Sequence, residues 1–91
     1  MAEQILRRDV IVKNKMGLHA RPATQLVKLA TSFDSNITLI KGDKRVSASS
    51  ALGIMMLGSH CGESIVVEDE GIDASAALEA IVDLIGQQFD E

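Results

Sequence analysis

The sequence is poor in aromatic residues, in proline and in cysteine. Its only aromatic side chains are two phenylalanines, whereas RNA-binding modules that stack bases need aromatic platforms, so that class is disfavoured. The single cysteine, Cys61, has no partner for an internal disulfide, which excludes a disulfide-stabilised scaffold. No apolar run approaches the roughly 18 residues that a membrane-spanning helix needs, so we expect no membrane segment.

Basic residues are missing from the second half of the chain. Residues 1–45 hold all nine Lys and Arg with four acids, whereas residues 46–91 hold nine acids and no base. The net charge of −4 argues against a nucleic-acid partner. The asymmetry either marks an interaction surface or disappears when the two halves mix in space, and we favour mixing.

The length and composition predict one folded domain. A chain of 91 residues with 46% hydrophobic residues is long enough for a single core, so residues 1–91 are expected to form one domain. Residues 1–4 show no basic stretch that leads into an apolar run, which predicts no signal peptide. With an unpaired cysteine, the expected location is the cytoplasm.

Hydrophobic periodicity predicts four strands and three helices. The expected strands cover residues 5–13, 36–41, 44–48 and 64–70. The expected helices begin near Ala20, at residue 51 and after Asp73 or Ser75, and the last has a buried stripe formed by Ala77, Leu78, Ile81, Leu84, Ile85 and Phe89. The order βαββαβα predicts an α+β, open-faced β-sandwich, in which three helices cover one face of a four-stranded, mostly antiparallel sheet.

The start of the first helix has a composition suited to an anion. Pro22 is tolerated only in a first helical turn, so the helix is expected to begin near Ala20 with His19 at or beside its N-cap. The backbone amides of Ala20 and Arg21, the guanidinium of Arg21 and the dipole of the helix then favour a phosphate beside the His19 imidazole. The alternative is an ordinary helix start with a surface histidine and arginine.

The segment 17–23 reads GLHARPA and precedes an amphipathic helix. It is similar to the active-site motif of the HPr family, the histidine phosphocarriers of the bacterial phosphotransferase system. The resemblance continues through segments 46–50 (VSASS) and 53–58 (GIMMLG) and the loop with Gly62, and so covers nearly the whole chain. It implies the family's fold, phosphorylation of His19 on Nδ1 and stabilisation of the phosphate by Arg21.

The resemblance also implies partners. A phosphoryl group would come from enzyme I and pass to an enzyme IIA-type protein, so the protein is a carrier and its own covalent intermediate, with no cofactor and no metal. We expect a monomer that binds neither nucleic acid nor membrane. Within the family, segment 54–57 (IMML) and the ending FDE look more like the nitrogen-related branch, NPr, than the sugar-transport branch, and the other motifs fit either.

Residues of the first two helices suggest regulation or docking. Ser50 aligns with a serine that HPr kinase phosphorylates in many members, but its neighbours here are Ser49 and Ala51, and a plain helix cap is the alternative. Leu52 and Met55, with Met56 beside them, are candidates for a docking patch, although a short helix must bury one face and some of these are expected in the core. On the first helix, Lys28 matches a family lysine that meets acidic partners.

Other site types have weaker support. His60 and Cys61 are adjacent, but a metal site needs three or four ligands. The acidic run 68–70 lacks EF-hand spacing and is expected to be a solvated turn. Of other function classes, an acyl carrier modified on Ser50 is disfavoured by the predicted strands, and an independent hydrolase by the lack of an acid near His19 in sequence.

Overall fold

The computed structural model describes residues 5–87 and has seven elements in the order βαββαβα. The strands are β1 (Ile5–Ile11), β2 (Ser35–Lys41), β3 (Lys44–Ser47) and β4 (Ser64–Gly71), and the helices are α1 (Ala20–Ala30), α2 (Ala51–Met56) and α3 (Ala74–Gly86). The predicted elements are all present. The strands end within one or two residues of their predicted ends, because backbone hydrogen bonding, rather than hydrophobicity, decides where a strand ends.

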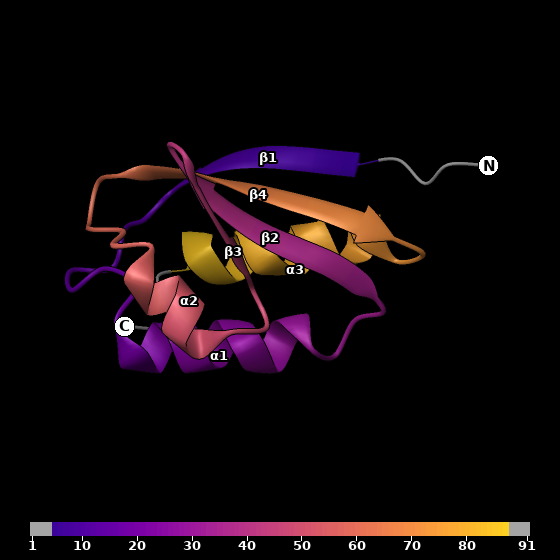
Figure 1. Ribbon diagram of the computed structural model, residues 1–91, viewed down its shortest axis with the longest axis horizontal. Coiled ribbons are helices and arrows are strands. Elements are labelled where there is room, and N and C mark those ends of the chain that lie inside the picture. Colours follow the sequence, from indigo (N-terminus) through magenta and orange to yellow (C-terminus); the bar gives the residue numbers. More distant parts are fainter. Residues whose placement is uncertain (1–4, 88–91) are drawn as a thin grey trace.

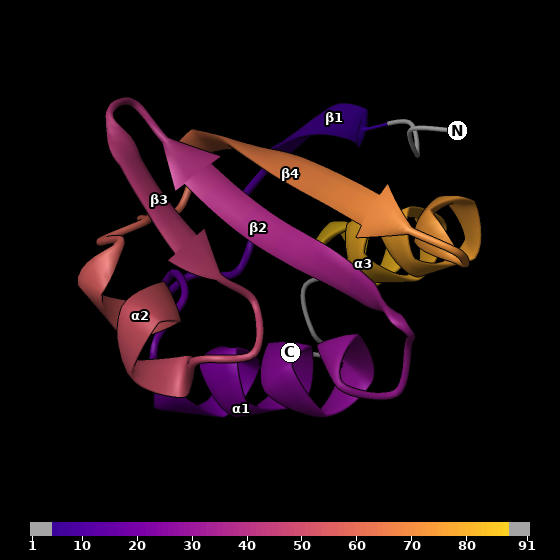
Figure 2. The same ribbon diagram turned by 45° about the vertical axis from the view of Figure 1, so that its right-hand side comes forward.

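The four strands form one antiparallel sheet in the order β1-β4-β2-β3 (Figure 2). Strand β4 lies in the middle, with Val67 opposite Arg8 of β1 and Leu39 of β2. Strands β2 and β3 are joined by a tight turn at Gly42, which has a φ of 59°. The predicted open-faced fold is therefore confirmed, with an edge strand on each side of the sheet.

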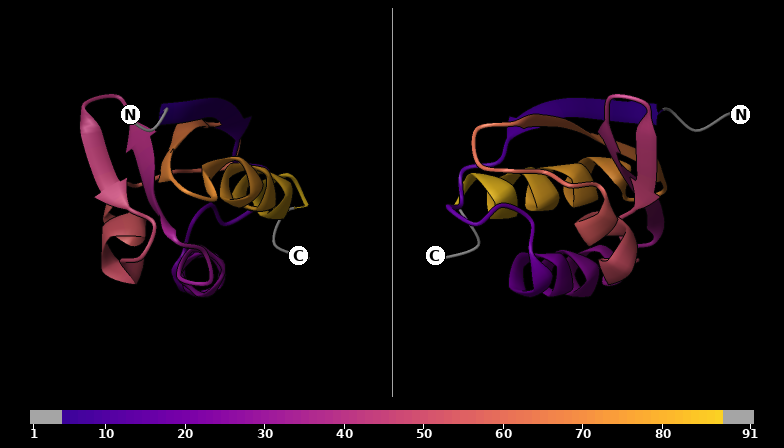
Figure 3. Two further views of the ribbon diagram at one scale, coloured as in Figure 1. Left: turned by 90° about the vertical axis from the view of Figure 1, so that its right-hand side faces the viewer. Right: turned by 60° about the vertical axis from the view of Figure 1, so that its left-hand side comes forward.

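The helices lie on one side of the sheet and leave the other side open (Figures 1 and 3). Side chains that alternate along the strands and recur at helical spacing meet in the layer between them. Fully buried members include Val12, Leu26, Leu39, Ile54, Leu57, Ile65, Val67, Ile81 and Ile85. The stripe predicted for α3 is buried except for Leu84, which is partly buried, and Phe89, which lies outside the described residues.

The acidic run 68–70 lies within strand β4, as the predicted strand 64–70 requires, and the expectation of a solvated turn is wrong. These residues continue strand β4, so their side chains alternate between its two faces. Glu68 lies on the open face and accepts hydrogen bonds from Arg7 of β1 (2.8 Å) and Arg45 of β3 (2.6 Å). Burial raises the pKa of Glu68, but the hydrogen bonds and charges of the two arginines outweigh it and hold the pKa below its usual range.

Asp69 points to the opposite face and is fully buried. It follows Ile65 and Val67 in the row of side chains beneath the helices, which a period of two places in the core. Burial raises the pKa of the Asp69 carboxyl, and the nearby charge of Asp73 adds to the effect. The strand register therefore places an acid where polarity alone predicts solvent.

Charges from the two halves of the chain mix in space, as favoured above. From the basic half, Arg7 and Arg45 pair with Glu68 of the acidic half, and Lys41 pairs with Glu63.

Among residues 5–87, no helix combines the length and the hydropathy needed to cross a membrane.

Candidate functional site

His19 occupies the N-cap of α1, as predicted from the position of Pro22. Its backbone is extended, with φ −83° and ψ −167°, and its carbonyl oxygen accepts the first intrahelical hydrogen bond, from the Ala23 amide at 2.9 Å. Pro22 is buried in the first turn, where the absence of its N–H removes no intrahelical bond. His19 as a residue is half-buried.

The first turn of α1 supplies positive potential beside His19. Ala20 and Arg21 are exposed, and their backbone amides precede the first intrahelical hydrogen bond at the positive end of the helix dipole. No acidic residue lies in this turn to oppose that potential. The arrangement suits a phosphate group held next to the His19 imidazole, with the Arg21 guanidinium within reach of the same end of the helix.

The loop that leads into His19 is held by buried polar contacts that sequence reasoning missed. Asn14 is fully buried, and its side-chain amide donates a hydrogen bond to the Gly17 carbonyl. The Gly17 amide donates back to the Asn14 carbonyl at 3.0 Å, and the Leu18 amide donates to the Ser59 carbonyl at 3.1 Å. An Asn three residues before a Gly is a turn signal that would have found the first contact, but the contact with Ser59 is not local.

Gly17 is required by this loop for two reasons. Its φ of 70° lies in the left-handed region, where other residues are strained. A Cβ at this position would also run into the Ser59 carbonyl oxygen. Gly17 therefore allows the close approach of the loop 58–63.

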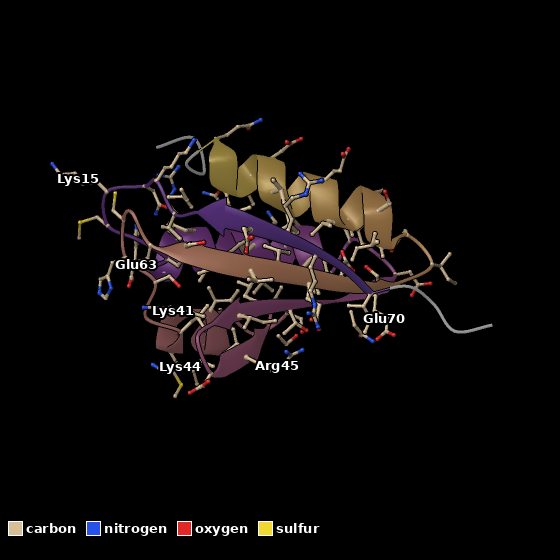
Figure 4. All side chains as sticks on the ribbon, turned by 90° about the horizontal axis from the view of Figure 1, so that it is seen from above. Lys15, Lys41, Lys44, Arg45, Glu63 and Glu70 are labelled. Carbon is tan, nitrogen blue, oxygen red and sulfur yellow. The ribbon has the colours of Figure 1, made fainter. Side chains whose placement is uncertain are left out.

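A network of charges anchors the loop 58–63 at the same end of the sheet (Figure 4). The Lys41 ammonium donates to the Gly58 carbonyl (2.7 Å) and to Glu63 Oε1 (3.0 Å), and Glu63 Oε1 also accepts from the His60 amide (2.6 Å). The hydrogen bond from the His60 amide, with those from Lys41 and the His60 ring, lowers the pKa of Glu63 to about 2. In Figure 4, Lys15 projects from this same end, and Glu70 marks the opposite end.

Helix α2 packs against α1 (Figure 1). It exposes apolar side chains to solvent. Leu52 is 65% exposed, Met55 40% and Met56 67%, and the buried residue of the helix is Ile54. The expectation that some of the first three belong to the core is therefore wrong, because Ile54 together with the following Leu57 fills the core position. We call Leu52, Met55 and Met56 the α2 patch.

Ser50 is the N-cap of α2. Its side-chain oxygen accepts a hydrogen bond from the Gly53 amide at 3.0 Å, so the capping role predicted as one alternative is observed. The side chain is exposed. Lys28 is exposed in the last turn of α1, where a positive charge is favourable to the helix dipole.

His60 and Cys61 are exposed loop residues. The His60 ring lies 3.0 Å from Glu63 Oε1, and the Cys61 thiol lies 3.5 Å from the Lys13 carbonyl. Within residues 5–87, no group of three or more His, Cys, Asp or Glu side chains is arranged to hold a metal ion.

The comparison with known families matches the site and most of the chain. The family model described as "PTS HPr component phosphorylation site" matches residues 6–87. The chain belongs to the HPr family. HPr proteins are phosphocarriers of the phosphotransferase system, and this HPr-family protein has the same fold and function class.

Relatives from both branches of the HPr family are similar to the chain. The phosphocarrier protein NPr of Shewanella violacea is 49% identical over 86 residues, which cover 94% of each chain. The phosphocarrier protein HPr of Treponema pallidum is 42% identical over 84 residues, covering 92% of this chain and 96% of the relative. The crystal structure of HPr-C-His from Thermoanaerobacter tengcongensis has a TM-score of 0.91 at 43% identity, covering 94% of this chain and 97% of that one.

Proposed function

We propose that His19 is the residue that accepts and donates the phosphoryl group. The observation that supports this most directly is the half-buried histidine at the N-cap of an eleven-residue helix, next to the exposed Arg21. The donor is the phosphohistidine of enzyme I and the acceptor is an enzyme IIA-type protein. The family model's match to residues 6–87 supports residues 1–91 as one phosphocarrier domain.

The transfer balances without a cofactor. A lone pair on Nδ1 of neutral His19 attacks the phosphorus, the nitrogen–phosphorus bond to the donor histidine breaks, and the donor imidazole recovers its lone pair. In a second step of the same kind, phosphorylated His19 is the donor and the acceptor protein supplies the attacking nitrogen. Since a histidine replaces a histidine, the protein is a stoichiometric carrier and its phosphorylated form is the intermediate.

Arg21 and the first amides of α1 act on the phosphate. The guanidinium offers a fixed set of donors for phosphate oxygens, and the amides of Ala20 and Arg21 add partial positive charge. Because Arg21 is exposed, Arg21→Ala should slow transfer while changing the free energy of unfolding by no more than about 0.5 kcal/mol. Thermal unfolding and transfer rates measured on the same sample test the two effects separately.

Partner docking uses the surface around His19. The α2 patch, with Leu52 and Met55 at its centre, supplies apolar area next to α1, and Lys28 supplies positive charge on α1 itself. Methionines adapt to several partners, which suits a protein that must bind a donor and then an acceptor. Charge steering by Lys28 should make association with enzyme I slower as salt rises.

The two histidines of the chain provide a matched test of the acceptor. His19→Ala and His60→Ala each remove one imidazole, and His60 lies in the loop 58–63 rather than at a helix N-terminus. With phosphoenolpyruvate and enzyme I, His60→Ala should be labelled like the parent and His19→Ala should not be labelled. Labelling of His19→Ala, or loss of labelling in His60→Ala alone, would refute the assignment.

A second, regulatory role is favoured by one comparison. The NPr of Shewanella violacea is 49% identical, whereas the HPr relatives and HPr crystal structures range from 37% to 45%. We therefore also propose that the chain works in the nitrogen-related branch, signalling through its phosphorylation state. Competing phosphorylation by enzyme I from the sugar branch and from the nitrogen branch, compared as kcat/KM, distinguishes the two.

Ser50 is the candidate for regulation by an HPr kinase/phosphatase. A phosphate there adds about −1.5 to −2 charge beside the α2 patch, which would oppose docking of an acidic partner. Ser50→Asp should fold and be phosphorylated on His19 more slowly than the parent, whereas equal rates would leave Ser50 as the helix cap alone.

We propose that the working form is a monomer, which light scattering tests.

A further inference from the structure

The peptide group between Gly17 and Leu18, one residue ahead of His19, is held from both of its ends. The Gly17 carbonyl accepts a hydrogen bond from the Asn14 side-chain amide, and the next amide, that of Leu18, donates to the Ser59 carbonyl at 3.1 Å. These two groups belong to the same planar peptide unit, so fixing both fixes its orientation. Its orientation decides the direction in which the chain enters His19.

Asn14 is the more specific of the two anchors. Ser59 contributes its backbone carbonyl, which any residue could supply, but the Gly17 carbonyl is held by a side chain. The amide of Asn14 is fully buried, and its Oδ1 has no hydrogen-bond partner among the residues that the structure describes. A buried amide with one unmatched oxygen is costly to the fold, so stability alone does not account for it.

The rest of the loop offers little other support. Lys15 and Met16, at the centre of the turn, are exposed, with Met16 at 72%. The start of the loop is held by backbone hydrogen bonds of Val12 with Gly62 and Glu63 and by the contact of Cys61 with the Lys13 carbonyl, whereas the part next to His19 is held by Asn14, Leu18 and Ser59. Without the Asn14 amide, the Gly17 carbonyl loses the partner that sets the tilt of this peptide.

We propose that Asn14 is a positioning residue for phosphoryl transfer, which orients the His19 imidazole by holding the Gly17–Leu18 peptide. This proposal rests on the proposed role of His19. Asn14 touches neither the phosphate nor the partner, and acts through the backbone that precedes the nucleophile. An imidazole that is free to tilt spends less time with Nδ1 in line with the donor, so the loss should appear in kcat rather than in KM.

The test compares Asn14→Ala with Val12→Ala, a control that truncates a fully buried side chain in the same segment without touching the Gly17–Leu18 peptide. A purified enzyme I with phosphoenolpyruvate gives kcat and KM for each variant as substrate. We expect Asn14→Ala to lower kcat about tenfold or more with KM within about twofold, and Val12→Ala to keep kcat within about twofold although it lowers Tm. Equal kcat losses in the two variants would show that Asn14 has only a structural role, and overturn the proposal.

Two further variants keep the test decisive if Asn14→Ala does not fold. Asn14→Ser retains a donor at the turn and should recover part of the lost kcat. Asn14→Asp has nearly the same shape but directs a carboxylate oxygen at the Gly17 carbonyl, so it should be as slow as a variant without the donor. An Asn14→Asp variant with the parent kcat would overturn the proposal.

An NMR measurement separates this proposal from that on His19. The imidazole ¹H–¹⁵N signals of His19 in the unphosphorylated protein should shift in Asn14→Ala and not in Val12→Ala, and no partner is needed to see this. If the parent is labelled elsewhere than on His19, the proposed function fails while the imidazole comparison still reads the orientation. If the parent is labelled on His19 and Asn14→Ala matches it in kcat and in imidazole signals, only the role of Asn14 fails.

Discussion

Replacing Gly17 with alanine should destabilise the protein more than the same change at Gly42. Both glycines have φ in the left-handed region, 70° and 59°, so both variants share a strain of about 1–2 kcal/mol. A Cβ at Gly42 has no atom within 4 Å, whereas a Cβ at Gly17 would run into the Ser59 carbonyl oxygen. Gly42→Ala therefore measures the strain alone, and the difference between the variants measures the contact between the two loops.

The size of that difference follows from what the Cβ displaces. Moving the Ser59 carbonyl breaks its hydrogen bond with the buried Leu18 amide, and an unsatisfied buried amide costs about 1–3 kcal/mol. For a domain of this size, each kcal/mol corresponds to about 4–8 °C in Tm. Gly17→Ala should therefore melt at least about 4 °C below Gly42→Ala.

Thermal unfolding followed by circular dichroism, with urea unfolding as a check on two-state behaviour, provides the assay. Labelling by enzyme I at a temperature where both variants are folded adds a functional readout, in which Gly17→Ala should be slow and Gly42→Ala should resemble the parent. Equal losses of Tm in the two variants would refute the reasoning, because the backbone strain would then explain everything.

Three further predictions concern the buried and paired acids. Burial raises the pKa of Asp69 above its usual value of about 4, so the folded state holds the proton more tightly than the unfolded state does. The free energy of unfolding therefore falls as the pH rises from about 4 through the raised pKa. Asp69→Asn should be stabilising in urea unfolding, and by more at pH 7 than at pH 4. Glu63, with its pKa lowered to about 2, stabilises the fold above the usual carboxyl range and loses this effect as pH falls towards 2, so a carboxyl ¹³C titration midpoint near 4 would contradict the network described. Arg7→Ala and Arg45→Ala should each lower the free energy of unfolding by about 1 kcal/mol or less. The loss in the double variant should exceed the sum of the two single losses by about 1–2 kcal/mol, because Glu68 is then a buried charge without either arginine. Additive losses would contradict this.

Local chemistry made the start of α1 predictable from the sequence. Pro22 can stand only in a first turn, and this fixed the helix start at Ala20 and the cap at His19. The strands were predictable for a similar reason, since Ile37 and Leu39 stand two residues apart, on one face of a strand, and both are buried. Each of these features is encoded within a few residues of where it occurs.

The features that sequence reasoning missed depend on neighbours that are distant in the chain. Asp69 is polar, but strand β4 continues beyond its hydrophobic residues. The alternation of side chains along the strand then places the Asp69 carboxyl in the core. The sequence named the α2 patch as a docking candidate, but the exposure of all three side chains depends on how α2 packs against α1 and β3. The Ser59 carbonyl reaches Leu18 only after the sheet has brought their two loops together.

The pairing of β1 with β4 determines when a newly made chain can assemble the loop that precedes His19. Strand β1 pairs only with β4, from the other half of the sequence, and the loop after β1 depends on carbonyls and amides of Ser59 and Gly62. The GLHARPA motif leaves the ribosome early, but at that stage its loop has neither the strand partner nor these contacts. On the proposed role of His19, the phosphate site is therefore completed only after strand β4 has been synthesised and has paired with β1.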